Sequence, residues 1–113
     1  MQVTDFHDLK DTALRSFEER LQQAAPGRCS TAEIEVNRLE SQLVQLYGIA
    51  ALMARRETEL GRIATIWSAM IPVCDDFARG VQEVCAEHPA CLGSYDNILD
   101  IRNKCARLRD LHS

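Results

Sequence analysis

The chain has 113 residues and a formal net charge of −4 at pH 7, with 46% hydrophobic, 27% charged and 5% aromatic residues. This mixture is typical of one globular domain and argues against intrinsic disorder. The acidic balance argues against general nucleic-acid binding, and no apolar run reaches the roughly 18–20 residues of a membrane span. Few aromatic and glycine residues, with abundant Ala, Leu, Arg and Glu, favour helix over sheet.

The first predicted helix covers residues 4–24. Thr4 or Asp5 can cap its N-terminus, and its apolar residues follow three- and four-residue steps that form one stripe. Pro26-Gly27 then ends the helix.

A second helix begins at the capping box Ser30-Thr31-Ala32-Glu33 and carries a long heptad repeat of apolar residues. Glu57 is the one polar residue in this repeat, which continues to Cys85. A repeat of this length predicts a coiled-coil seam that packs against other helices. The predicted partner-binding residues of the seam are Val36, Leu39, Leu43, Leu46, Met53, Leu60, Trp67 and Ile71.

Two positions could interrupt this long helix. Pro72 lacks an amide donor and clashes with the preceding turn, so we expect a kink there between helices 31–71 and 72–87. The polar segment 55–59 offers Thr58 as a possible cap, but no Gly or Pro marks a turn. If the helix continues through this segment, Glu57→Leu should stabilise the chain, whereas a loss of stability would indicate a turn.

The last predicted helix covers residues 94–111, with Ser94 as its cap and basic residues in its C-terminal half. The short connection 88–93 makes it an antiparallel neighbour of the preceding helix. The sequence therefore predicts a single all-α domain over residues 1–113, in which a long heptad-bearing helix packs with an N-terminal and a C-terminal helix as an antiparallel bundle or coiled coil.

Five cysteines are many for this length. A hairpin near position 89 would place Cys85 near Cys91 and Cys74 near Cys105. This arrangement is similar to the coiled-coil-helix–coiled-coil-helix proteins of the mitochondrial intermembrane space, which would imply a disulfide-stapled hairpin. Those proteins have twin CX9C pairs, whereas the spacings here are CX10C and CX13C. The alternative is reduced thiols that act as small core residues, with Cys29 unpaired in either case.

Cys85, His88 and Cys91 have the residue types of a zinc site, and Cys74 or Cys105 could supply a fourth ligand. However, structural zinc sites usually combine two separated ligand pairs, and this is one cluster across a bend. We therefore expect no metal and no other cofactor, with His88 a polar residue that ends a helix.

Arg107 and His112 match the pattern R-x4-H near the end of a small helical chain, which resembles the HEPN ribonucleases. The resemblance implies that this pair would act on the 2′-hydroxyl and the scissile phosphate of RNA. The alternative is a solvated basic helix end. Asp75 and Asp76 are adjacent on a helix and should point about 100° apart, so they do not form a paired-acid site.

The sequence thus has long apolar stripes and no evident catalytic grouping. Because the heptad stripe is longer than the other predicted helices can cover, we expect a non-enzymatic interaction or scaffold subunit. Its partners would be other helical chains or a second copy of itself. Small subunits of kinetochore and spindle complexes, and of coiled-coil complexes that handle lysosomes, are similar in this respect. No secretory signal is evident after Met1, so we expect an intracellular protein of the cytoplasm or nucleus, with the mitochondrial intermembrane space as the alternative.

Overall fold

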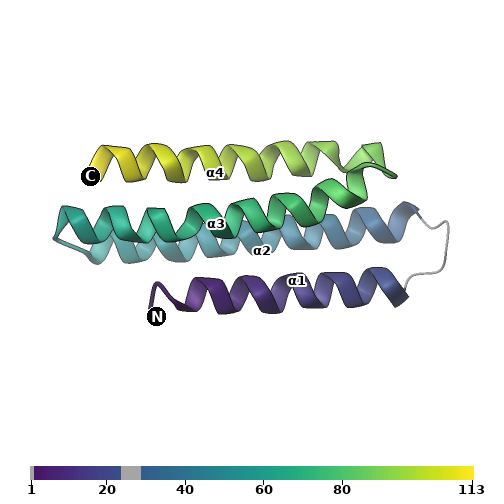
Figure 1. Cartoon of the computed structure of the whole chain (residues 1–113), viewed down its shortest axis with the longest axis horizontal. Helices are drawn as coiled ribbons and strands as arrows, with labels where there is room; N and C mark the ends of the chain where they lie inside the picture. The colour runs from purple at the N-terminus through teal and green to yellow at the C-terminus, as the bar shows by residue number, and fades with distance from the viewer. Residues whose placement is uncertain (1, 24–28) are drawn as a thin grey trace.

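Four α-helices and one short 3-10 turn make up most of the part of the chain that the computed structural model describes, residues 2–23 and 29–113 (Figure 1). In chain order they are α1 (Asp5–Gln23), α2 (Cys29–Arg56), α3 (Leu60–Cys85), the turn η1 (Pro89–Cys91) and α4 (Leu92–His112). No strand occurs among these residues. The predicted all-α bundle is therefore confirmed.

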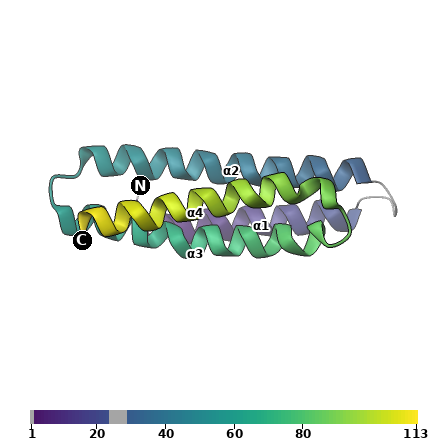
Figure 2. The same ribbon diagram turned by 90° about the horizontal axis from the view of Figure 1, so that it is seen from above.

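α2 and α3 form a central antiparallel hairpin, and α1 and α4 lie on opposite sides of it (Figures 1 and 2). Each of the two outer helices contacts both α2 and α3. Within the described residues, α1 and α4 make no contact with one another. The result is an elongated bundle with principal extents of 50 × 23 × 16 Å.

The break in the long helix lies at residues 57–59, so the predicted helices 31–71 and 72–87 are wrong. Glu57 produces this break without Gly or Pro, because its Oε1 accepts hydrogen bonds from the amides of Thr58 at 3.1 Å and Glu59 at 3.2 Å. These bonds replace the helical partners that the two amides would otherwise need. Glu59, not Thr58, is the N-cap of α3, and it contributes no side-chain capping bond.

α3 continues through Pro72 as one helix. The proline deprives the carbonyl of Ser68 of its helical donor. Pro72 and Ser68 are both exposed, so water can bond to that carbonyl. Buried neighbours such as Ile71 and Val73 hold the helix against the core on either side of the proline. The predicted boundary between two helices at Pro72 is therefore wrong, because α3 is assigned as one helix on both sides of it.

The core runs along the α2–α3 hairpin and is closed on each side by an outer helix. Phe6 and Phe17 of α1 pack onto one side, and Ile98 and Cys105 of α4 pack onto the other. A fully buried side chain such as Ile98 contributes roughly 1.5–3 kcal/mol through removal of its surface from water.

The outer helices end close to the predicted positions, with α1 at Asp5–Gln23 and α4 at Leu92–His112. Ser94 does not cap α4, because the helix begins two residues earlier and the Ser94 hydroxyl donates to Asn37 Oδ1 of α2 at 3.0 Å. The predicted stop at Pro26-Gly27 and the capping role of Ser30 lie outside the described residues and side chains. None of the described helices has the length and apolar character needed to cross a membrane.

Candidate functional site

The predicted partner-binding seam is mostly buried inside the chain itself. Met53 is half-buried, and Leu60 is 63% exposed beside the 57–59 loop. The other six seam residues belong to the core: Val36, Leu39, Leu43, Leu46, Trp67 and Ile71. The prediction assumed one long helix, whereas the turn at 57–59 folds α3 back onto α2, so the two helices cover each other's stripes. These six residues are therefore not available on the surface of the folded chain.

The opposite side of α2 is exposed and carries no charge along about four turns. Residues 41–54 contain no Asp, Glu, Lys, Arg or His. We define the α2 outer face as the exposed residues of this segment, which are Ser41, Val44, Gln45, Gly48 and Leu52. Val44 and Leu52 are each 52% exposed. The side of a helix that faces water is normally rich in charged residues, so this face differs from an ordinary solvated surface.

Gly48 lies at the centre of the α2 outer face. A Cβ atom built at this position would have no neighbour within 4 Å. Glycine in a helix interior costs about 1 kcal/mol relative to alanine, so the chain carries this cost without any packing need of its own. The absent side chain does, however, leave room for a close approach of another backbone.

Two grooves border α2. The α1–α2 groove is uncharged, has a volume of about 230 Å³, and is lined by Leu9, Thr12, Ala13, Gln42, Gln45, Leu46 and Ile49. The α2–α4 groove consists of two hollows of about 520 and 340 Å³ that share Tyr47 and Lys104. Its lining combines apolar residues such as Val44, Ile101 and Leu108 with charged residues of α4.

Tyr47 forms the base of the α2–α4 groove. Its ring lies 5.4 Å, centroid to centroid, from that of the buried Trp67, in a tilted arrangement. Burial raises the pKa of the Tyr47 hydroxyl above its ordinary value, Cys105 adds to this effect, and Arg107 opposes it. Tyr47 of α2 and Arg107 of α4 therefore line the same hollow of this groove.

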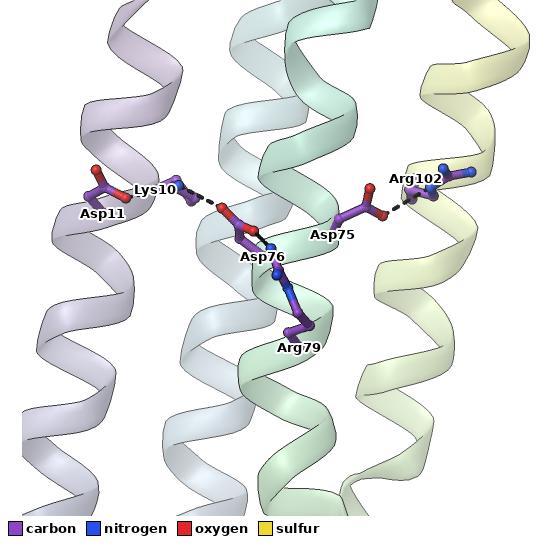
Figure 3. Close-up of polar contacts among 6 residues, drawn as sticks. All are labelled: Lys10, Asp11, Asp75, Asp76, Arg79 and Arg102. Atoms are coloured by element: carbon purple, nitrogen blue, oxygen red, sulfur yellow. Dashed lines mark hydrogen bonds and ion pairs between the residues drawn. The ribbon is translucent and has the colours of Figure 1, made fainter.

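Asp75 and Asp76 bind different helices, as their predicted divergence implies (Figure 3). Asp76 Oδ2 accepts a hydrogen bond from Lys10 Nζ of α1 at 2.7 Å, and its other oxygen pairs with Arg79. Asp75 Oδ1 accepts a bond from Arg102 Nε of α4 at 3.0 Å. Two adjacent residues at the middle of α3 thus each form an ion pair with a different outer helix.

Lys10 is the charged residue that sequence reasoning missed, because it lies within the apolar side of α1 and is only 5% exposed. Besides Asp76, it pairs with Asp11 at 2.9 Å. Its hydrogen bond lowers the pKa of the Asp11 carboxyl below the ordinary value. The buried Lys10 therefore meets two carboxylates, as a buried cation requires.

Glu35 is a second buried charge, located where α2 lies against the end of α1. Arg20 of α1 is 3.6 Å from its Oε2, and Arg38 is 3.7 Å from its Oε1. The Arg20 contact ties α1 to α2, whereas Arg38 belongs to the same helix as Glu35.

Three residues with the chemistry of metal ligands lie around the bend between α3 and α4, namely Cys85, His88 and Cys91. Among the described residues, no three His, Cys, Asp or Glu side chains are grouped so that they could hold a metal ion. The zinc arrangement considered from the sequence is therefore not formed in this structure. Nδ1 of His88 is buried and has no hydrogen-bond partner within the described residues.

The hairpin brings the cysteines together in the predicted pairs, but as free thiols. The neighbouring thiol of Cys105, together with burial, raises the pKa of the Cys74 thiol. Burial also raises the pKa values of Cys85 and Cys91, and Cys85 adds to the effect at Cys91. These groups are thus poor nucleophiles near neutral pH. The side chain of Cys29 lies outside the description.

Arg107 and His112 are not brought together on one face of α4. Five residues apart on a helix, they point about 140° from each other. Arg107 is exposed, whereas His112 is half-buried and its Nδ1 lies 2.7 Å from the carbonyl oxygen of Leu108. This geometry is that of an ordinary helix end.

Comparisons of the chain with protein-family models, curated proteins and solved structures gave no match. The observations that bear on function are therefore the fold and its surfaces. They define a bundle of four helices, within the described residues, whose second helix presents a charge-free outer face.

Proposed function

We propose that this chain is a non-enzymatic helical interaction subunit, and that it binds a helix of a partner protein on the α2 outer face. The observation that carries the proposal is the absence of charge from residues 41–54 of an exposed helix. Four turns of a helix correspond to roughly 21 Å, which suits one partner helix of similar length.

The chemistry of the surface indicates the chemistry of the partner. A charged side chain placed against the middle of this face, near Gly48, would lose water without gaining an opposite charge, so the partner helix should contact this part of the face with uncharged residues. Gly48 permits the two helices to approach closely at the centre of the contact. The uncharged α1–α2 groove beside this face can receive longer apolar side chains of the partner.

The buried free thiols support an intracellular location for such a subunit. Disulfides form in oxidising compartments, and cysteines in the cytoplasm and nucleus stay reduced. Cys74 lies near Cys105 and Cys85 lies near Cys91, yet all four are free thiols, which is typical of a reducing compartment. Within this proposal, the cysteines serve as core residues of the α3–α4 hairpin.

The test uses Gly48→Glu, which places a charge at the centre of the contact while it improves helix propensity. The free chain should melt at a higher temperature than the wild type. In affinity purification from the source cells, the stoichiometric partner recovered with the wild-type chain should be lost with Gly48→Glu.

Gln82→Glu is the matched control, because it adds the same charge at an exposed position of α3. It should retain the partner. Equal recovery of partners with Gly48→Glu and wild type, or the absence of any stoichiometric partner, would overturn the proposal.

A further inference from the structure

α4 presents a second surface that the proposed function does not use. The α4 outer stripe is the set of exposed residues Leu92, Asp96, Asp100, Lys104, Arg107 and Leu111. Successive members are three or four residues apart, so they share one side of the helix. Along this stripe an apolar residue is followed by two acidic residues, two basic residues and a second apolar residue.

Two copies of this stripe are complementary to each other when the two helices run antiparallel. If two copies of α4 are laid antiparallel with the two-fold axis near Arg102, Arg107 of one copy faces Asp96 of the other. Lys104 then faces Asp100, and Leu111 faces Leu92. The same axis serves all three pairings, as an isologous contact requires.

The charges of the stripe have no partners within the described part of the chain. Neither Lys104 nor Arg107 forms an ion pair there, and neither do Asp96 and Asp100. Other charges of the same helix are paired, since Arg102 lies 3.0 Å from Asp75. The unpaired charges are thus confined to the outward side of α4.

The stripe also borders the α2–α4 groove, which supplies apolar surface. Val44 is more than half exposed, Ile101 and Leu108 are half-buried, and Leu111 is 75% exposed. Exposed ion pairs contribute little free energy each, so they would set the register of a contact rather than its strength. Burial of the leucines and of the groove would supply the affinity.

We propose that two copies of the chain associate through the α4 outer stripe as an antiparallel, two-fold symmetric homodimer. The contact uses α4 and the α2–α4 groove, and it leaves most of the α2 outer face open to a different partner. The proposal therefore goes beyond the proposed function and does not rest on it.

An intramolecular effect could also explain the order of charges. Acidic residues near the start of a helix and basic residues near its end are both favoured by the helix dipole. This effect predicts lower melting temperatures when the charges are reversed, but it predicts no association between different variants. The test must therefore measure association in mixtures.

The experiment uses an acidic variant, Lys104→Glu with Arg107→Glu, and a basic variant, Asp96→Lys with Asp100→Lys. Sedimentation equilibrium of the wild-type chain should show a dimer that weakens as salt is raised. Each variant alone should bind itself at least roughly tenfold more weakly, because all four ion pairs become like-charge contacts. An equimolar mixture should form a heterodimer, since every facing pair then has opposite charges.

The control is Arg55→Glu with Arg56→Glu, which changes the net charge as the acidic variant does, but at exposed positions on another helix, and it should dimerise like the wild type. Circular dichroism verifies that all variants are folded. A wild-type chain that stays monomeric, variants that dimerise like the wild type, or a mixture that stays monomeric would each overturn the homodimer. A monomer that still loses a partner on Gly48→Glu would overturn the homodimer and leave the proposed function standing.

Discussion

The neighbouring carboxylates of α3 provide an internally controlled test of what holds the bundle together. Asp75 and Asp76 are the same residue type on the same helix, and each pairs with a cation of an outer helix. The two ion pairs differ in the burial of the cation, because the side chain of Lys10 is 6% exposed whereas that of Arg102 is 38% exposed. We therefore expect Asp76→Asn to destabilise the chain several times more than Asp75→Asn.

The magnitudes follow from the two environments. Removal of one partner from a buried ion pair costs roughly 3–5 kcal/mol, because the other charge stays buried. Asp11 still contacts Lys10 at 2.9 Å but is itself nearly half exposed, so it offsets part of the loss. We expect Asp76→Asn to cost about 2–3 kcal/mol, and Asp75→Asn less than about 1 kcal/mol. In melting temperature, the former corresponds to a decrease of roughly 10 °C for a chain of this size.

The assay is thermal and urea unfolding followed by circular dichroism at 222 nm, with both variants measured beside the wild type. A third variant, Lys10→Met with Asp76→Leu, removes both charges and should recover most of the stability lost in Asp76→Asn. Equal losses for Asp75→Asn and Asp76→Asn, or no recovery in the double variant, would refute the assignment of Lys10 as a buried cation that depends on Asp76.

Two further predictions concern the 57–59 loop and the thiols. Glu57→Leu should lower the free energy of unfolding, measured in urea, by about 1 kcal/mol, because the amides of Thr58 and Glu59 lose their acceptor. Glu57→Gln keeps an acceptor oxygen and should retain most of the stability. A gain in stability with leucine would indicate a continuous helix instead. In a Cys29→Ser background, iodoacetamide at pH 8 should modify the native chain slowly, because burial raises the thiol pKa values of Cys85 and Cys91 and leaves little thiolate. The rate should increase as the pH rises above 9, and all four remaining cysteines should react after unfolding; rapid modification of the folded chain, read by mass spectrometry, would contradict their burial.

The helical class and the outer helices could be predicted from the sequence because local signals determine them. Asp5 begins α1 as expected, and the antiparallel return before α4 follows from Pro89 and a short connection. The 57–59 turn could not be predicted in the same way, because it depends on one carboxylate that turns back onto the next two amides. Pro72 was a misleading signal, since an exposed proline in a well-packed helix need not interrupt it.

The misplaced turn also explains why most of the predicted seam is buried inside the folded chain. The heptad repeat identified the residues of α2 and α3 that must be covered, but it could not show that these two helices cover one another. The charge-free segment 41–54 is visible in the sequence, yet its importance depends on knowing which side of α2 faces outward. The pairing of Lys10 with Asp76 joins residues 66 positions apart, which no local pattern encodes.

The separation of α1 from α4 has a consequence for the order in which the chain assembles. α3 and α4 meet across a short connection, so their hairpin closes with little loss of chain entropy. α1 contacts only α2 and α3, and it makes no contact with α4 on the opposite side of the described bundle. It can therefore detach as a unit while the other three helices stay packed, and its backbone amides should exchange with solvent hydrogen faster than those of the α3–α4 hairpin.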